Sequence, residues 1–273
     1  MKRCVPIIVM LLIFAHSIAF AEETKTSASE SEILSKIVET SLGKGVKVIR
    51  TDNPEKSPVE GWTQTRVWIE SVYGETPVLF YSAGDGKFIF AGSLFSSSGE
   101  NLTRKDVGET RARVIELEKM EPNPDYVIGK SEVPVKAVLW LGTDMYSKEL
   151  FETFYDLYKK NQDKVVLYIK FYPKSKPDRE KMVALTCFKN EALVKGLQVI
   201  YDAHPNWGSS EDLETFKKTG QPEACSEEQV SIDLRNAAML KLPPHAVAFV
   251  NGNMLIENAT KENIMKLAGT ELQ

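Results

Sequence analysis

The chain has 273 residues, and its 34 basic and 38 acidic side chains give a formal net charge of −4 at pH 7. This acidic balance gives no general electrostatic reason to bind nucleic acid or anionic lipid, so we expect neither as a partner. The length suits one large domain or two smaller ones. The three cysteines, Cys4, Cys187 and Cys225, are far apart, so the sequence contains no CxxC pair.

The first 21 residues have the three regions of a secretory signal peptide. Lys2 and Arg3 form a basic start, residues 5–14 are almost all apolar, and Ala19 and Ala21 supply the small residues of a cleavage site. An apolar run of about ten residues is too short to span a bilayer. We therefore expect residues 1–21 to be removed and the mature protein to be periplasmic, with no membrane span. An uncleaved N-terminal anchor is the alternative, and the cleavage site argues against it.

A polar stretch and then a helical pattern open the mature chain. Residues 22–31 are rich in Ser, Thr and Glu, and this composition predicts disorder. In residues 33–42 apolar side chains recur at helical spacing, and Gly43 is placed to end that helix. The first helix is therefore expected only after residue 31.

Strand patterns follow this helix. Residues 65–73 alternate between apolar and polar side chains as a strand does. Residues 78–81 and 88–91 flank a Gly-Asp-Gly turn, which is typical of a β-hairpin. We expect residues 32–102 to form a first domain in which one helix packs on a small antiparallel sheet.

A charged segment, residues 103–124, separates the two halves of the chain. Val107, Val114 and Leu117 fall on one side of a helical projection, and the Pro-rich residues 121–124 would end such a helix. We therefore expect a linker helix in this segment.

Residues 125–273 form the second predicted domain. Residues 135–141 and 165–171 are continuous apolar runs, typical of strands buried on both faces. The Lys-rich residues 170–181 are broken by prolines and acids and are expected to be solvated loop. The other predicted elements are a helix between the two strands, helical stretches near residues 179–201 and 226–240, a hairpin in residues 246–256 and a final helix capped by Thr260. This order of elements is that of a thioredoxin fold.

Four short motifs carry a family resemblance. Residues 78–92, VLFYSAGDGKFIFAG, form a strand pair around a DGK turn. Cys187 lies in LTCFKN and Cys225 in EAC, and residues 246–252 read AVAFVNG. In order and spacing these motifs resemble the periplasmic disulfide isomerases of the DsbC/DsbG family over nearly the whole mature chain. The resemblance implies an α+β protein, with an N-terminal cystatin-like dimerisation domain, the linker helix and a C-terminal thioredoxin-like domain that carries a helical insertion.

The chain departs from this family at its redox centre. There a Cys-x-Tyr-Cys motif stands at a helix N-terminus, where the helix dipole lowers the pKa of the thiol. The matching residues here are Asp144, Met145, Tyr146 and Ser147. Neither aspartate nor serine forms a disulfide, so we predict that CxxC chemistry is lost. We interpret Asp144 as a helix N-cap, worth roughly 0.5–2 kcal/mol, rather than as a catalytic carboxylate.

The cis-proline site of the family is altered as well. Pro244 and His245 stand where the family has Thr-Pro, and a shift of one residue would let Pro244 keep the role of that proline. His245 would then lie near Asp144, and an acid–base pair is one interpretation. No nucleophile accompanies it, so an ordinary surface histidine is favoured. His204 is the other histidine of the mature chain.

For Cys187 and Cys225 the resemblance implies a structural disulfide. Such a bond would hold the helical insertion, with its mobile loop at residues 203–208, and would stabilise the protein by roughly 4 kcal/mol in the loop-entropy model. An exchange-active pair and two free thiols are the alternatives. Two cysteines and two scattered histidines show no metal-ligand spacing, and we expect neither a metal nor a cofactor.

We therefore expect a redox-inactive, chaperone-like or protein-interaction module. The resemblance implies a homodimer formed through the N-terminal domain, with unfolded or envelope proteins as clients, and disulfide isomerase activity is not expected to persist. One alternative is a thiol-disulfide interchange protein that uses Cys187 and Cys225 or the thiols of a partner. The other is a scaffold of an envelope complex that binds its partner at residues 144–148.

Overall fold

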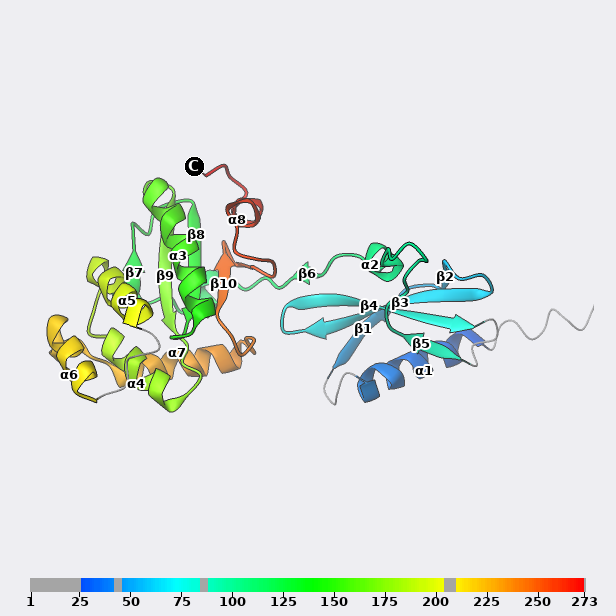
Figure 1. The fold of residues 1–273 in the computed structure, drawn as a ribbon, viewed down its shortest axis with the longest axis horizontal. Coiled ribbons are helices and arrows are strands. Elements are labelled where there is room, and N and C mark those ends of the chain that lie inside the picture. Colours follow the sequence, from blue (N-terminus) through cyan, green and yellow to red (C-terminus); the bar gives the residue numbers. More distant parts are fainter. Residues whose placement is uncertain (1–25, 42–45, 84–87, 204–209, 273) are drawn as a thin grey trace, which may run out of the picture. The chain divides into compact units, whose positions relative to one another are not determined.

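The computed structural model describes residues 26–41, 46–83, 88–203 and 210–272. The chain divides into two compact units (Figure 1). One contains residues up to 71 together with 75–110, and the other contains residues 72–74 together with 111–273. The predicted signal peptide, residues 1–21, lies outside the described residues.

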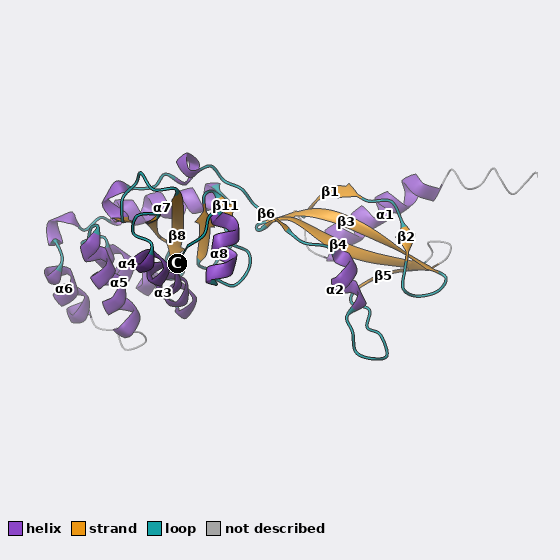
Figure 2. Cartoon of the chain, turned by 90° about the horizontal axis from the view of Figure 1, so that it is seen from above, coloured by secondary structure: helices purple, strands orange, loops and turns teal. Residues whose placement is uncertain are grey.

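The N-terminal unit is a sheet with one long helix against it (Figure 2). The strand order is β1-β3-β4-β5, and β2 pairs with β3. Leu34 and Val38 of the helix pack against Val67, Ile69 and Phe80 of the sheet, and burial of these side chains holds the two layers together. The elements are α1 (Thr26–Ser41), β1 (Lys47–Thr51), β2 (Glu55–Lys56), β3 (Trp62–Ser71), β4 (Gly74–Ala83), β5 (Ile89–Ala91) and α2 (Leu102–Val107).

The predicted hairpin is confirmed, and the predicted start of the first helix is corrected. Strands β4 and β5 pair antiparallel, with Phe80 opposite Ala91; the turn itself, residues 84–87, lies outside the described residues. Helix α1 begins at Thr26, so residues 26–31 are helical, where disorder was predicted. The stretch from 26 to 41 contains neither Pro nor Gly, so a helix that is held by its buried residues extends toward the N-terminus at little cost per residue. Gly43 falls outside the described residues.

The prediction of one linker helix over residues 103–124 is wrong. Asn101 caps α2 by accepting a hydrogen bond from the backbone N–H of Arg104, and α2 ends before Gly108, which has a positive φ of 87°. The chain then continues through a short strand, β6 (Arg111–Ala112), and two 3₁₀ turns, Leu117–Met120 and Pro124–Tyr126. A glycine at positive φ ends a helix, so the apolar spacing of residues 107–117 is not used for helical packing.

The C-terminal unit is built on a sheet of strand order β11-β10-β8-β9-β7. Strand β8 runs parallel to β9, while β10 pairs antiparallel with β8 and β7 antiparallel with β9. This is the thioredoxin topology that the order of elements predicted. The strands are β7 (Val127–Ile128), β8 (Val135–Leu141), β9 (Val165–Phe171), β10 (Val247–Val250) and β11 (Asn253–Met254).

Side-chain alternation along β8 and β9 divides the core of this unit into two layers. The odd-numbered residues of both strands, such as Leu139 and Ile169, lie in one cluster with residues of α3, α4, α5 and α8. The even-numbered residues Val138, Trp140, Val166 and Tyr168 lie in a second cluster with residues of β10 and α7. Both strands are therefore buried on both faces, as their continuous apolar runs predicted.

The described part of this unit has six α-helices besides the sheet, and Figure 1 shows their arrangement. The helical stretch predicted near residues 179–201 is two helices, because the chain turns between them at residues 186–190, where Asn190 has a φ of 52°. Helix α6 was not predicted, and of the loop predicted at 203–208 only Ala203 is described. Thr260 caps the last helix, as predicted. The helices are α3 (Met145–Lys160), α4 (Lys176–Leu185), α5 (Glu191–Ala203), α6 (Ser210–Thr219), α7 (Glu227–Met239) and α8 (Lys261–Ala268), with a 3₁₀ turn at Pro222–Ala224.

Candidate functional site

The candidate site is the first turn of α3, which follows the carboxyl end of β8. Asp144 is the N-cap: its backbone is extended, and its Oδ1 accepts a hydrogen bond of 3.1 Å from the backbone N–H of Ser147. This bond satisfies one of the free N–H groups at the helix start. The aspartate at this position therefore performs the capping role that was inferred for it.

The same carboxylate forms an ion pair with Lys174, three residues after the end of β9. Oδ2 of Asp144 lies 2.8 Å from Nζ of Lys174, and both side chains are about one-third exposed, at 31% and 35%. Burial alone would raise the pKa of Asp144, but the Lys174 ammonium and the Ser147 N–H together outweigh it and hold the pKa below its ordinary value of 3.8. Asp144 is thus an ionised, paired carboxylate, which is unsuited to accept or donate a proton near neutral pH.

Ser147 is fully buried, and its hydroxyl is used within the turn. Its Oγ accepts a hydrogen bond of 2.8 Å from the backbone N–H of Gly142, at the end of β8. The carbonyl of Gly142 in turn accepts a bond of 3.1 Å from the hydroxyl of Tyr201, a side chain of α5 whose pKa burial raises well above the ordinary value. These bonds tie the strand end, the helix start and α5 together. Ser147 therefore acts in the local fold.

Met145 and Tyr146 point outward from the same turn, with exposed fractions of 60% and 74%. They line a groove on the C-terminal unit together with Leu150, His245, Leu255 and Ile256. The structure thus brings Met145 and Tyr146, which were predicted to lie at the CxxC position of the DsbC/DsbG family, and the residue after Pro244 to one groove. Pro244 itself is exposed, in the turn before β10.

The acid–base pair considered for Asp144 and His245 is not formed. Within the described residues, the partners of Asp144 are Ser147 and Lys174. Nδ1 of His245 lies 2.7 Å from the carbonyl oxygen of Ala246. His204 lies outside the described residues.

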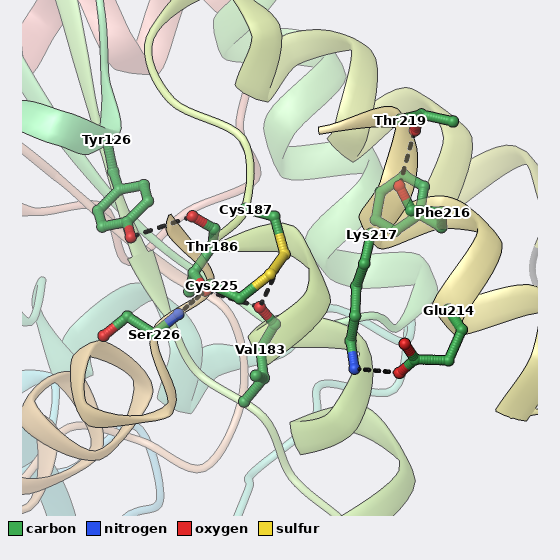
Figure 3. Close-up of a disulfide and its surroundings, with 10 residues drawn as sticks. All are labelled: Tyr126, Val183, Thr186, Cys187, Glu214, Phe216, Lys217, Thr219, Cys225 and Ser226. Carbon is green, nitrogen blue, oxygen red and sulfur yellow. Dashed lines mark hydrogen bonds and ion pairs between the residues drawn. A yellow bond between two sulfur atoms is a disulfide. The ribbon is translucent and has the colours of Figure 1, made fainter. Parts of the chain in front are cut away.

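Cys187 and Cys225 form a disulfide (Figure 3). Cys187 follows α4 and is fully buried, and Cys225 precedes α7, so the bond closes the segment that contains α5 and α6. A hydrogen bond beside the disulfide joins the same two segments: the Thr186 hydroxyl accepts a bond of 2.6 Å from the backbone N–H of Ser226. The Thr186 carbonyl accepts a bond of 3.3 Å from the hydroxyl of Tyr126. Burial, with a contribution from Asp125, raises the pKa of Tyr126 to about 12, so its hydroxyl remains a donor.

Sequence reasoning missed a buried ion pair on the second face of the sheet. Lys170, predicted to begin a solvated loop, is the last even-numbered residue of β9, and its side chain is fully buried. Its Nζ lies 2.6 Å from Oδ1 of Asp233 on α7, which is also fully buried. The available signal was a lysine inside the apolar run of residues 165–171, because lysine is almost never fully buried unless it is paired.

Neither a metal-binding cluster nor a membrane-spanning helix is present in the described part of the chain. Within it, no group of three or more His, Cys, Asp and Glu side chains is arranged to hold a metal ion. None of the helices in these ranges has the length and apolar character needed to cross a membrane.

Comparison with known proteins matches the first part of the chain to one family model and just over half of the chain to solved structures. Residues 21–104 match the family model of the disulfide bond isomerase protein N-terminal domain. No curated protein matches the sequence. Solved structures match over little more than half of the chain.

Three of these structures come from different bacteria. Oxidised BdbD from Bacillus subtilis is 17% identical, with a TM-score of 0.43 over 54% of this chain and 94% of its own. A periplasmic thioredoxin-like protein from Salmonella enterica serovar Typhimurium is 14% identical, with a TM-score of 0.42 over 57% of this chain and 99% of its own. A protein-disulfide isomerase from Novosphingobium aromaticivorans is 9% identical, with a TM-score of 0.45 over 55% of this chain and 100% of its own.

Proposed function

We propose that this chain, whose residues 21–104 match the disulfide bond isomerase N-terminal domain and whose C-terminal unit has the thioredoxin topology, is a DsbC-like protein that works as a redox-inactive, chaperone-like or protein-interaction module. It acts in the periplasm after removal of residues 1–21. It works as a homodimer joined through the N-terminal domain, and its clients are unfolded or envelope proteins.

The proposal that the protein is redox-inactive rests on the side chains at the start of α3, where the family has its redox centre. Thiol-disulfide exchange needs a thiolate that is accessible and stabilised, most often at a helix N-terminus. At the start of α3 that position holds the paired carboxylate of Asp144 and the buried hydroxyl of Ser147. The two cysteines of the mature chain are joined to each other, and Cys187 is fully buried. No accessible thiolate is therefore present among the described residues to begin thiol-disulfide exchange.

Client binding is supported by the groove beside α3. Methionine adapts its shape to varied apolar partners, and tyrosine offers a large apolar face with a polar tip. Met145 and Tyr146 are both strongly exposed there. A groove of this character can hold an apolar segment of another protein without any covalent step.

The test is a pair of assays on the purified chain of residues 22–273. We expect it to suppress the aggregation of a denatured, cysteine-free client, and to show no reductase or isomerase activity. A double variant, Met145→Asp with Tyr146→Asp, should lose this suppression. Met239→Asp is the matched control, because Met239 is equally exposed but lies on α7, outside the groove. A monomeric protein without effect on the client would rule the proposal out.

Redox chemistry is tested by restoring the missing centre. We expect the variant Asp144→Cys with Ser147→Cys to gain disulfide reductase activity that the natural chain lacks, because the helix start would then stabilise a thiolate. The reduction potential of the Cys187–Cys225 pair is the second measurement. A value below about −300 mV is expected for a structural bond, whereas about −120 to −200 mV would identify the pair as the active redox centre and overturn the proposal.

A further inference from the structure

The segment that leads into the C-terminal unit, residues 113–126, lies along it as a strap. Its first part is extended and pairs with the β10–β11 hairpin: the backbone N–H of Ile115 donates to the Gly252 carbonyl at 2.8 Å, and the N–H of Met254 donates to the Arg113 carbonyl at 2.8 Å. Gly252 has a φ of 83°, and a Cβ at that position would lie 2.7 Å from the Ile115 carbonyl oxygen. The glycine therefore allows both the turn and the close approach of the strap.

The strap covers the second apolar face of the sheet. Ile115 and Met120 are buried in the same cluster as Trp140, Val166 and Phe249. The residues between them are mostly exposed, so the strap alternates between insertion into this cluster and contact with solvent. It is thus part of the core of this unit, although it contains little regular structure.

Buried polar side chains hold the second part of the strap by three hydrogen bonds. Nζ of Lys170 donates to the Glu121 carbonyl at 2.9 Å, and Nδ2 of Asn236 donates to the Lys119 carbonyl at 3.0 Å. Nδ2 of Asn123, in the strap, donates to Oε1 of Gln229 at 2.6 Å. Two of these bonds end on backbone carbonyls, so they fix the position of the chain rather than recognise its side chains.

Three buried polar residues of α7, two of which bond the strap directly, lie along one face of that helix. Gln229, Asp233 and Asn236 are four and three positions apart, the spacing of one helical stripe, and all are buried. Asp233 is the centre of the group: its Oδ1 accepts from Gln229 at 2.9 Å and pairs with Lys170, and its Oδ2 accepts from the backbone N–H of Phe171 at 2.8 Å.

Burying an ion pair in a protein core costs desolvation free energy. Well-packed apolar side chains at two such positions are often as stable as a buried ion pair, or more stable. What an apolar pair cannot do is donate a charged hydrogen bond to a backbone carbonyl, and such a bond is stronger than a neutral one. Glu121, whose carbonyl receives this bond, is held at a φ of 49°, a conformation that non-glycine residues seldom adopt.

We propose that the Lys170–Asp233 pair is a latch that fixes the strap, residues 113–126, on the second face of the sheet. The pair specifies the position of the strap and adds no net stability to the domain. Neutralising both partners leaves the domain folded and releases the strap.

Hydrogen exchange of the mature chain tests the latch. The variant is Lys170→Met with Asp233→Leu, which replaces both charges together and avoids an unpaired buried charge. The backbone N–H groups of Lys119, Glu121 and Tyr126 are hydrogen-bonded within the strap, so each has measurable protection. We expect these amides to exchange at least about tenfold faster in the variant, while the amides of β8 and of β9 keep their protection, apart from Phe171, whose N–H loses its acceptor on Asp233.

Two further variants keep the result decisive. Asn236→Ala removes one carbonyl contact and keeps the ion pair, so it should raise exchange only near Lys119. Lys119→Ala removes an exposed ion pair with Glu116 in the same strap and should change nothing. Unchanged strap exchange in the double variant would overturn the proposal. Equal acceleration across strap and sheet would also overturn it, because the pair would then be a general source of stability.

Discussion

Two Asp–Lys pairs lie at the same end of the C-terminal sheet and differ mainly in their access to water. Asp144 and Lys174 meet at the start of α3, 2.8 Å apart and partly exposed. Asp233 and Lys170 meet between α7 and β9, 2.6 Å apart and fully buried. The two lysines are four positions apart in the chain. Both pairs therefore join the same two chemical groups, and they differ in how far they are buried.

The two carboxyl groups respond in opposite directions. The pKa of Asp144 lies below its ordinary value of 3.8, because Lys174 and the helix start outweigh partial burial. The pKa of Asp233 lies above 3.8, because burial outweighs Lys170, the Phe171 N–H and the Gln229 amide. In the partly hydrated pair the attraction to lysine therefore stabilises the charged carboxylate. In the buried pair the cost of removing the carboxylate from water is larger than the attraction to lysine. Asp144 of the first pair also caps α3. The second pair does not stabilise the fold enough to explain its presence, so a different role has to be sought for it.

The largest expected effect comes from breaking the buried pair on one side only. Lys170→Met should lower the free energy of unfolding by about 3–5 kcal/mol, because the Asp233 carboxylate is left buried without its cation. Urea unfolding of the chain of residues 22–273, followed by circular dichroism, measures the change. The double variant Lys170→Met, Asp233→Leu should recover most of the loss. A single variant as stable as the natural chain would show that the pair is not energetically coupled.

At the exposed pair the expected loss is smaller. Asp144→Ala should cost about 0.5–2 kcal/mol, because it removes the N-cap of α3 together with the ion pair. Asp144→Asn keeps an oxygen that can accept from the Ser147 N–H, so it should cost less than about 1 kcal/mol. The same unfolding experiment compares them. Equal losses in the two variants would assign the effect to the charge rather than to the cap.

The pH dependence should separate the two aspartates by sign. Because the pKa of Asp144 is lowered, its stabilising contribution is present above pH 3.8 and is lost as the pH falls through its folded-state pKa. Because the pKa of Asp233 is raised, its contribution is full below pH 3.8 and is lost as the pH rises through its folded-state pKa. Unfolding free energies between about pH 3 and 7 should therefore slope less steeply upward in Asp144→Asn. In the Lys170→Met, Asp233→Leu variant they should slope more steeply upward.

Salt should have the smallest effect and should act on one pair alone. Added NaCl screens partly exposed charges and hardly reaches buried ones. A double-mutant cycle on Asp144 and Lys174 should lose a few tenths of a kcal/mol of coupling between low and 1 M salt. The cycle on Lys170 and Asp233 should be unchanged. A salt-sensitive buried pair would mean that water reaches it.

The parts of the fold that sequence predicted well are those with a single physical solution. Strands β8 and β9 match their predicted bounds residue for residue, because a continuous apolar run between polar turns has to be buried on both faces. The cap at Thr260 was likewise local and correct. The strap was predicted as a helix, because Val107, Val114 and Leu117 have helical spacing. Its real partners are the distant residues Gly252 and Lys170, which no local pattern could reveal.

The candidate site was predictable only in part, for the same reason. Asp144 as a cap followed from its place before a helical pattern. The disulfide followed from family resemblance rather than from the residues themselves. Lys174 as the partner of Asp144 and Asp233 as the partner of Lys170 depend on how β9, α3 and α7 meet in three dimensions. Both pairs therefore required the structure.

The strand order of the C-terminal sheet also determines when a growing chain can bury its most apolar segments. Strand β8 has β9 on one side and β10 on the other, and β10 comes after all the helices of the insertion. Until residues 247–250 have been made, one edge of β8 offers unpaired backbone groups beside a continuous apolar strand, the features of an aggregation-prone edge. A nascent chain that stalls within α7 should therefore precipitate or require a protective partner. The last thirty or so residues therefore decide whether the rest of the chain stays in solution.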